Sequence, residues 1–363
     1  MVGFTDNSSK AKLGHVQSQG PRATNRQSPE PDARHAPGVG GRIVLAVLAA
    51  GLLLVALEVT ARIVIFGASG LDPRRVPLIA DTPVKEFVTF ETEPSISWQM
   101  KPDQDTFFKL VRLRTNSWGM RDEEYPLAKP EGTFRVAVLG SSFSLPAGVE
   151  IEDAYHSVLE ERLSARFAPR SYEFLNFAVG AQMPSQSVAM LIHRALRFDP
   201  DLVIVSATQM ALPHFLLEWN KRPYPQVLDQ VFSGPRSFLV ELVKSRLQLL
   251  PEKAWIRPPH FPRRPAKGPD VIEKLAEISR QQGVPIVLFR IAYDPIEPTP
   301  IERSIERRAR AEGLYYVDSR PAFRGTDPRD SWIHELDPHP NARAHAVFAD
   351  VLAGFLRSRD LLR

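Results

Sequence analysis

The hydrophobic pattern of the chain begins with one long apolar segment. Residues 43–57 carry no charged side chain, and the apolar run resumes after Glu58. As a helix, residues 43–67 would extend about 37 Å at ~1.5 Å per residue, which is enough to cross a bilayer. Glu58 and Arg62 are four residues apart, so they can pair on one face near the end of that helix. We therefore predict a transmembrane signal-anchor helix over residues 42–67 and contact with the lipid bilayer through residues 43–67.

The segment before the anchor is polar, and its charge indicates an orientation. Residues 1–41 are rich in Ser, Gln, Pro and Gly, a composition that predicts a disordered tail. Six basic residues precede the apolar segment: Lys10, Lys12, Arg22, Arg26, Arg34 and Arg42. Only three follow it closely: Arg62, Arg74 and Arg75. This balance favours a cytoplasmic N-terminus and an extracytoplasmic C-terminal part, on the periplasmic or cell-surface side. A buried core helix and a cleaved signal peptide are the alternatives.

From about residue 130 the pattern alternates between short apolar runs and stretches with helical spacing. The apolar runs predict strands at 134–139, 172–178, 202–206, 284–291 and 314–317. Helical spacing predicts helices at 153–167, 184–198, 270–282 and from about Asn341 onward. Alternating strands and helices form a mostly parallel sheet with helices on both faces, and ligands bind such sheets beyond the carboxyl ends of the strands.

Two further stretches complete the predicted organisation. The α/β domain is assigned to residues 131–360, with a Pro-rich insertion at 222–269 that interrupts the alternation. The insertion contains FLVELVKSRLQLL, which predicts one amphipathic helix, either an ordinary packing helix or a lid or membrane-surface element. Residues 68–130 are a lead-in that forms either a stalk from the membrane or a cap over the site.

Composition excludes several function classes. The formal net charge of +4 is weak and scattered, and no basic helix or basic-aromatic stripe is present, so nucleic acid is not a predicted partner. The chain has no Cys, which excludes disulfides, thiolate metal sites and cysteine nucleophiles.

Candidate chemistry lies at two places that are far apart in the sequence. In FRVAVLGSSFSLPAG an apolar strand stops at Gly140, so Ser142 follows the carboxyl end of a predicted strand. A serine nucleophile needs a base and a group that orients the base. ELDPHPNARAH supplies Asp337 and His339 in a turn stiffened by two prolines. A phosphate loop would need a glycine or lysine pattern that LGSSFSLPAG lacks. A metal site that adds His345 has no further ligand cluster, so no metal or cofactor is predicted.

Four stretches together resemble one known family. They are TNSWGMRDEEYPLAKPEGTFRVAVLG, GSSFSLPAGVEIEDAYHSVLEERL, NFAVGAQMPSQSVAML and DPHPNARAH. Over roughly residues 93–358 the chain resembles the SGNH (GDSL-type) hydrolase superfamily, in particular its membrane-anchored envelope members. This resemblance implies a flavodoxin-like three-layer α/β/α sandwich with a mostly parallel sheet.

The resemblance also implies roles for individual residues. Ser142 matches the family's nucleophile, His339 its general base, and Asp337 the acid that orients the imidazole. The backbone N–H groups of Ser142 and of Gly180 or Ala181 match the oxyanion hole, where each donor contributes about 10²–10³ in rate.

Two positions depart from the family pattern. Ser141 stands where the family has Asp before the nucleophile. Met210 stands where an Asn side chain completes the oxyanion hole, and a thioether cannot donate a hydrogen bond. The neighbouring Gln209 could donate if the loop turns its amide inward.

The predicted function is that of a membrane-anchored serine esterase. Its substrate would be an ester or O-acyl group on an envelope glycan or lipid, hydrolysed through an acyl-serine intermediate. Two alternatives remain open: acyl transfer to a glycan hydroxyl, as in an O-acetyltransferase, and a degenerate domain that binds a glycan or a protein partner. The absence of the oxyanion Asn favours the degenerate domain, whereas the intact Ser142, Asp337 and His339 favour chemistry.

Overall fold

The computed structural model describes most of the α/β part of the chain and the apolar helix before it. The described residues are 38–71, 87–90, 96–109, 111–211, 237–240, 243, 270–334 and 337–363. Residues 1–37 of the predicted tail, and all of the predicted insertion except 237–240 and 243, lie outside them. The chain divides into two compact units, Met1–Leu53 and Leu54–Arg363.

The first helix, α1 (Val39–Phe66), is long and apolar enough to cross a membrane. It has 28 residues, about 42 Å at ~1.5 Å per residue, and a mean hydropathy of 2.6 over Val39–Val64. It starts three residues before the predicted anchor, at Val39. The predicted pair is present, with Arg62 Nε 3.3 Å from Glu58 Oε1. Gly67 follows with φ +63° and ends the helix.

A five-stranded parallel sheet lies at the centre of the second unit. Its order is β6 (Ser171–Asn176), β5 (Thr133–Leu139), β7 (Leu202–Ser206), β8 (Ile286–Arg290) and β9 (Tyr315–Asp318). All four strand pairs are parallel, so the carboxyl ends of the strands meet at one edge. In chain order this is 2-1-3-4-5, which confirms the predicted flavodoxin-like α/β/α fold.

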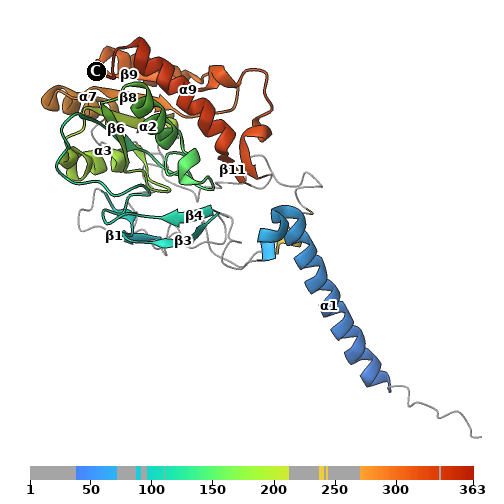
Figure 1. Ribbon diagram of the computed structural model, residues 1–363. Coiled ribbons are helices and arrows are strands. Elements are labelled where there is room, and N and C mark those ends of the chain that lie inside the picture. The colour runs from blue at the N-terminus through green and yellow to red at the C-terminus, as the bar shows by residue number, and fades with distance from the viewer. Residues whose placement is uncertain are drawn as a thin grey trace, which may run out of the picture. The chain divides into compact units, whose positions relative to one another are not determined.

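Alternate residues of the sheet enter two separate cores, which is why its strands carry apolar side chains on both faces. One face packs against α3 (Pro184–His193), α7 (Val271–Gln282) and α8 (Pro300–Ala311). The other face packs against α2 (Tyr155–Arg166) and α9 (Ala342–Ser358). Figure 1 shows α2 and α9 together beside the sheet.

Two antiparallel hairpins precede the sheet and extend its first core. β1 (Val88–Phe90) pairs with β2 (Trp98–Met100), and β3 (Asp105–Phe108) pairs with β4 (Val111–Arg114). These hairpins are drawn together in Figure 1. Their buried side chains belong to the same apolar cluster as the α3 face of the sheet: Val88, Trp98, Met100 and Leu113. These hairpins of the 68–130 lead-in are therefore packed against the α/β domain.

Side chains cap the starts of α7, α8 and α9, and α8 is a helix that the sequence periodicity did not predict. Asp270 caps α7 and Gly283 ends it with φ +67°. Asn341 caps α9 through the N–H of Ala344. The helix α8 begins with a capping box between Thr299 and Glu302, but its short apolar stripe gave no clear period.

Most predicted bounds are shifted by one or two residues, and two predicted elements differ in kind. The predicted helix 184–198 is divided into α3 and the 3₁₀ turn Ala195–Phe198, because Arg194 between them leaves helical geometry at φ −126°. The predicted turn with Asp337 and His339 is a short strand, β11 (Asp337–Pro340), which pairs with β10 (Trp332–His334).

Candidate active site

Ser142 lies in a tight turn at the carboxyl end of strand β5, between β6 and β7 in the sheet. The carbonyl of Ser141 accepts N–H groups from Ser144 and Leu145 at 3.0 and 2.9 Å, so the chain turns helically at once. Gly140 has no room for a side chain, since an added Cβ would lie 2.7 Å from Ser144 Oγ and 2.8 Å from Ser206 Cβ. Ser142 itself is half-buried. The turn therefore holds this hydroxyl at the edge where parallel sheets bind ligands.

The structure brings Asp337 and His339 together as predicted. His339 Nδ1 lies 2.6 Å from Asp337 Oδ1, and the same oxygen accepts the His339 backbone N–H at 3.1 Å. Asp337 is 1% exposed, so its carboxylate is shielded from water. Tyr293, which follows β8, donates its hydroxyl to the Pro338 carbonyl between the two residues. The backbone and the ring of His339 are thus fixed by separate contacts.

Phe143 connects the nucleophile turn to this pair. Its ring meets the imidazole of His339 edge-on, with centroids 5.5 Å apart, and lies 6.2 Å from the ring of Tyr293. The residue next to Ser142 in the chain therefore contacts the candidate base. The described residues include no hydrogen bond between the Ser142 hydroxyl and His339, a contact that is often formed only when substrate is bound.

Lys109, which sequence reasoning missed, completes the polar group around His339. It occupies the turn between β3 and β4 and is only 3% exposed. Its Nζ lies 2.9 Å from Asp337 Oδ2 and 2.9 Å from His339 Nδ1. Asp337 thus receives His339 on one oxygen and Lys109 on the other.

Burial and these contacts shift the pKa of all three groups. Burial lowers the pKa of Lys109 to about 8, although the charge of Asp337 opposes that shift. Burial alone would raise the pKa of Asp337, but Lys109 and His339 hold it well below its ordinary value. Burial, and then the Lys109 charge, lower the pKa of His339 despite the opposing effect of Asp337. At neutral pH the site therefore contains a carboxylate and a neutral imidazole.

The predicted glycine block forms the next loop along the sheet. Gly180 and Ala181 lie in a turn after β6, and Ala181 has the left-handed φ of +63°. Trp98 of β2 holds this turn: its Nε1 donates to the Gly180 carbonyl at 3.2 Å, and its own carbonyl accepts Gln182 Nε2 at 2.7 Å. Asn176 joins the loop to the nucleophile turn by donating to the Ser144 carbonyl at 3.1 Å.

The third predicted block is the 3₁₀ turn Thr208–Ala211 after β7. Met210 is partly buried and packs against the apolar core. The Gln209 side chain lies outside the described side chains. Thr208 is held on its hydroxyl and its carbonyl: its hydroxyl donates to the Ile291 carbonyl at 2.8 Å, and its carbonyl accepts Arg290 Nη1 at 3.4 Å.

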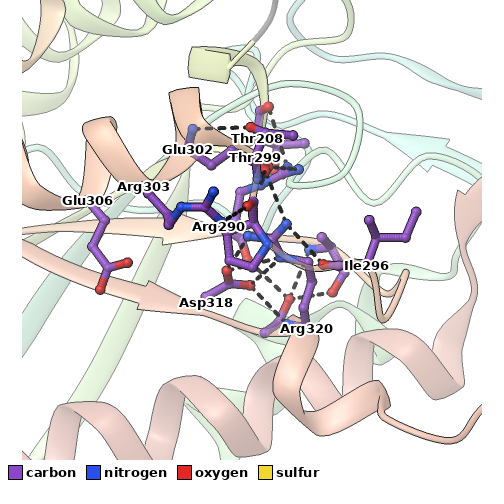
Figure 2. Close-up of polar contacts among 12 residues, drawn as sticks. Thr208, Arg290, Ile296, Thr299, Glu302, Arg303, Glu306, Asp318 and Arg320 are labelled. Atoms are coloured by element: carbon purple, nitrogen blue, oxygen red, sulfur yellow. Dashed lines mark hydrogen bonds and ion pairs between the residues drawn. The ribbon is translucent and has the colours of Figure 1, made fainter.

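Arg290 belongs to a buried ion cluster at the same edge of the sheet (Figure 2). Glu302 of α8 lies between two guanidinium groups, with Oε1 2.6 Å from Arg290 Nη2 and Oε2 3.2 Å from Arg320 Nη1. Arg320 also pairs with Asp318 at the end of β9. The cluster joins two strand ends to α8 and, through Arg290, to the Thr208 turn.

Arg121 is a second buried residue that sequence reasoning missed. It is 1% exposed and donates to the carbonyls of Leu145, Pro146 and Val149 at 3.1, 2.6 and 2.7 Å. It donates also to the Arg112 carbonyl at 3.0 Å. One guanidinium thus fixes the segment that follows the nucleophile turn.

Asp337, His339 and His345, the three residues weighed for metal binding, do not form a cluster that could hold a metal ion. His345 is fully buried on α9, and its Nδ1 accepts the backbone N–H of Tyr155 at 3.2 Å. Burial lowers the pKa of His345 to about 3, so its ring is neutral. Within the described part of the chain, no three His, Asp or Glu side chains form a group that could hold a metal ion.

When the chain is compared with known proteins, only the comparison with solved structures finds matches. No family model matches the sequence, and no curated protein matches it. A two-domain esterase active on acetylated mannans is 16% identical with a TM-score of 0.39. That match covers 62% of this chain and 49% of the other, so the chain spans about half of that protein's length.

Two single-domain esterases are similar at the same level. A catalytic mutant of the acetylxylan esterase Axe2 from Geobacillus stearothermophilus is 13% identical, with a TM-score of 0.38 and coverage of 62% of this chain and 93% of that one. The psychrotrophic esterase EstA from Pseudoalteromonas sp. is 13% identical, with a TM-score of 0.38 and coverage of 62% and 97%. All three solved structures are of esterases.

Proposed function

We propose that the protein is a serine esterase of SGNH type that hydrolyses an ester or O-acyl group through an acyl-Ser142 intermediate. The observation that carries this proposal is the Asp337–His339 pair, joined at 2.6 Å and reached by Phe143 of the nucleophile turn. A buried carboxylate that accepts the Nδ1 proton leaves Nε2 of the imidazole free as a base. The same arrangement on unrelated folds serves acyl transfer from esters and amides.

In the proposed mechanism, His339 Nε2 takes the proton of Ser142 while Oγ attacks the ester carbonyl. The tetrahedral intermediate collapses when His339 returns that proton to the leaving alcohol. Water then enters, gives a proton to His339 and attacks the acyl-serine. A second collapse releases the acid and restores Ser142.

The oxyanion is assigned to backbone donors, since Met210 is used for packing. The N–H groups of Ser142 and of Gly180 or Ala181 would meet the charge that develops on the carbonyl oxygen, with Gln209 as a further candidate. Removing one donor of this kind costs about 10²–10³ in rate, so a hole with two donors still supports catalysis.

The proposed location follows from α1. A helix of this length and hydropathy, with six basic residues before its apolar run begins at Ile43, supports a single-pass anchor with the α/β domain outside the cytoplasm. An enzyme held there reaches glycans and lipids of the cell envelope, which makes an O-acylated glycan or lipid the proposed substrate. Transfer of the acyl group to a glycan hydroxyl would use the same acyl-Ser142.

The test is covalent labelling of the full chain in detergent by a serine-reactive fluorophosphonate, read by intact mass and peptide mapping. We expect one adduct, on Ser142, that disappears in Ser142→Ala and forms at least 100-fold more slowly in His339→Ala. Ser141→Ala is the matched control and should still label. An adduct on Ser141, or folded protein that does not label, would overturn the proposal.

Two extensions of this experiment address substrate and side of the membrane. Acetylated glycans are incubated with the labelled and unlabelled enzyme, with and without a glycan acceptor. Free acetate indicates hydrolysis, whereas acetylated acceptor indicates transfer. A membrane-impermeant probe should label Ser142 in sealed spheroplasts, and labelling that appears only after lysis would contradict the proposed orientation.

A further inference from the structure

Lys109 is an unusual residue for the tip of a hairpin. Lys109 directly follows the last residue of β3, in a tight hairpin connection where Asn or Gly is favoured. Lys109 has the left-handed φ of +49°, a conformation that is unfavourable for a residue with a Cβ. Side chains at hairpin tips are normally solvated, but this one is 3% exposed. A buried ammonium is retained only where a specific partner compensates its lost hydration.

The partner is the acid of the candidate triad, and the contact is made on the oxygen that His339 does not use. Asp337 Oδ1 accepts from the ring and backbone of His339, and Oδ2 lies 2.9 Å from Lys109 Nζ. With these three donors both oxygens of the buried carboxylate are hydrogen-bonded, which stabilises its ionised form.

Nδ1 of His339 has two neighbours, and the position of its proton decides whether the ring can act as a base. If Nδ1 carries the proton and donates to Asp337 at 2.6 Å, Nε2 has a free lone pair. If Lys109 donated to Nδ1 at 2.9 Å instead, the proton would lie on Nε2 and block it. The shorter contact to a charged acceptor favours the first arrangement. In it, the ammonium beside the ring opposes a second proton on the imidazole.

We propose that Lys109 is a positioning residue of this site, which keeps Asp337 ionised and His339 neutral so that Nε2 accepts the nucleophile's proton. The catalytic part of this inference rests on the proposed function. Its structural basis is the geometry of the three side chains, which does not depend on the substrate.

Other groups around the ring add no charge at neutral pH. Tyr293 faces Pro338 from the end of β8, and burial raises its pKa above the ordinary value. His345 on α9 is neutral, because burial lowers its pKa to about 3. Phe143 packs on the imidazole from the nucleophile turn. Among the described residues, Lys109 and Asp337 therefore set the electrostatic environment of His339.

The experiment measures the pKa of His339 directly and needs no substrate. Deuterium exchange at the imidazole C2 carbon is followed residue by residue by mass spectrometry, in the full chain in detergent from pH 4 to 9. In the unmodified protein the pKa of His339 should lie below 6.5. In Lys109→Met it should rise by about one pH unit or more, because a like charge within 4–6 Å has been removed. Lys109→Arg keeps the charge and should preserve the low value.

Two controls separate this effect from a general loss of structure. Lys101→Met removes the same charge from an exposed position near the hairpin and should leave His339 unchanged. Exposed His193 serves as an internal standard in every variant. A pKa of His339 at or above 6.5 in the unmodified protein would overturn the inference even if Lys109→Met fails to fold. An equal pKa in folded Lys109→Met would do so as well.

The rate of fluorophosphonate labelling then connects the pKa to catalysis. The acid limb of its pH profile should move to higher pH in Lys109→Met together with the pKa of His339. If the pKa moves but Ser142 does not label in any variant, the positioning role stands and the proposed esterase function fails. If labelling occurs with an unmoved pKa and an unmoved acid limb, the function stands and the role of Lys109 is wrong.

Discussion

Replacing Glu302 by Gln should reveal how strongly the ion cluster of Figure 2 stabilises the carboxyl edge of the sheet. Glu302 is 5% exposed and is held by Arg290, Arg320 and the N–H of Thr299, the last at 2.8 Å. Gln has the same shape and can still accept the Thr299 N–H. The substitution therefore removes the charge between two guanidinium groups and leaves the helix cap in place.

The magnitude follows from the pKa of Glu302. Burial alone would raise it, but the Thr299 N–H and Arg290 hold it at about 2, compared with an ordinary 4.5. At about 1.4 kcal/mol per pH unit, this difference corresponds to about 3 kcal/mol of the free energy of unfolding at pH 7. Because the folded-state pKa is the lower one, the contribution is complete above about pH 5 and is lost as the pH falls toward 2. By pH 3 about half should remain.

Urea unfolding of the full chain in detergent, followed by tryptophan fluorescence at pH 7, 5 and 3, checks both the size and the sign. We expect Glu302→Gln to be less stable by about 3 kcal/mol at pH 7 and pH 5, and by about half of that at pH 3. Glu306→Gln is the matched control on the same helix, because its pair with Arg310 is solvent-exposed and should contribute at most about 0.5 kcal/mol. A difference that stays constant from pH 7 to pH 3, or one no larger than that of the control, would refute the reasoning.

Two other substitutions test the support of the nucleophile turn. Arg121→Met leaves the buried Leu145 and Val149 carbonyls without their donor. The loss should lower the free energy of unfolding by about 2–6 kcal/mol and the melting temperature by about 4–12 °C. The control Arg324→Met, at an exposed position, should change the melting temperature by less than about 1 °C. An unchanged melting temperature in Arg121→Met would contradict the inference that Arg121 fixes the segment after the nucleophile turn. Gly140→Ala places a methyl group 2.7 Å from Ser144 Oγ, so the turn must shift. Fluorophosphonate labelling of the folded variant should therefore be about 100-fold slower. Labelling at the original rate would show that the turn has room for the methyl group.

The fold was predictable from the sequence wherever local patterns decide it. The five strands alternate with helices at periods that the sequence displays, and the predicted 202–206 strand matches β7 in its bounds. Ser142 was recognisable because an apolar strand stops at a glycine and two hydroxyls. Helix α8 was missed, although Thr299, Pro300 and Glu302 form a capping signal that could have identified it.

Long-range polar contacts could not be predicted in the same way. Lys109 and Asp337 are 228 residues apart, and no local period connects them. The one available signal is that Lys109 interrupts the apolar run FFKLV, where a charged residue must either leave the core or find a partner inside it. The side chain of Met210 could be placed only by the fold, because the sequence does not say whether it points to the site or to the core.

The residues that sequence reasoning missed all lie in the lead-in before the sheet. This lead-in therefore contributes to the candidate site. Trp98 holds the Gly180 turn, Lys109 holds Asp337, and Arg121 holds the segment after the nucleophile turn. Each contact reaches a different segment of the candidate site, and each comes from the described residues 96–109 and 111–125. The parallel sheet determines where these segments begin, but it does not by itself hold the loops in one conformation. A stretch that precedes the sheet therefore fixes the three loops on which the proposed chemistry depends.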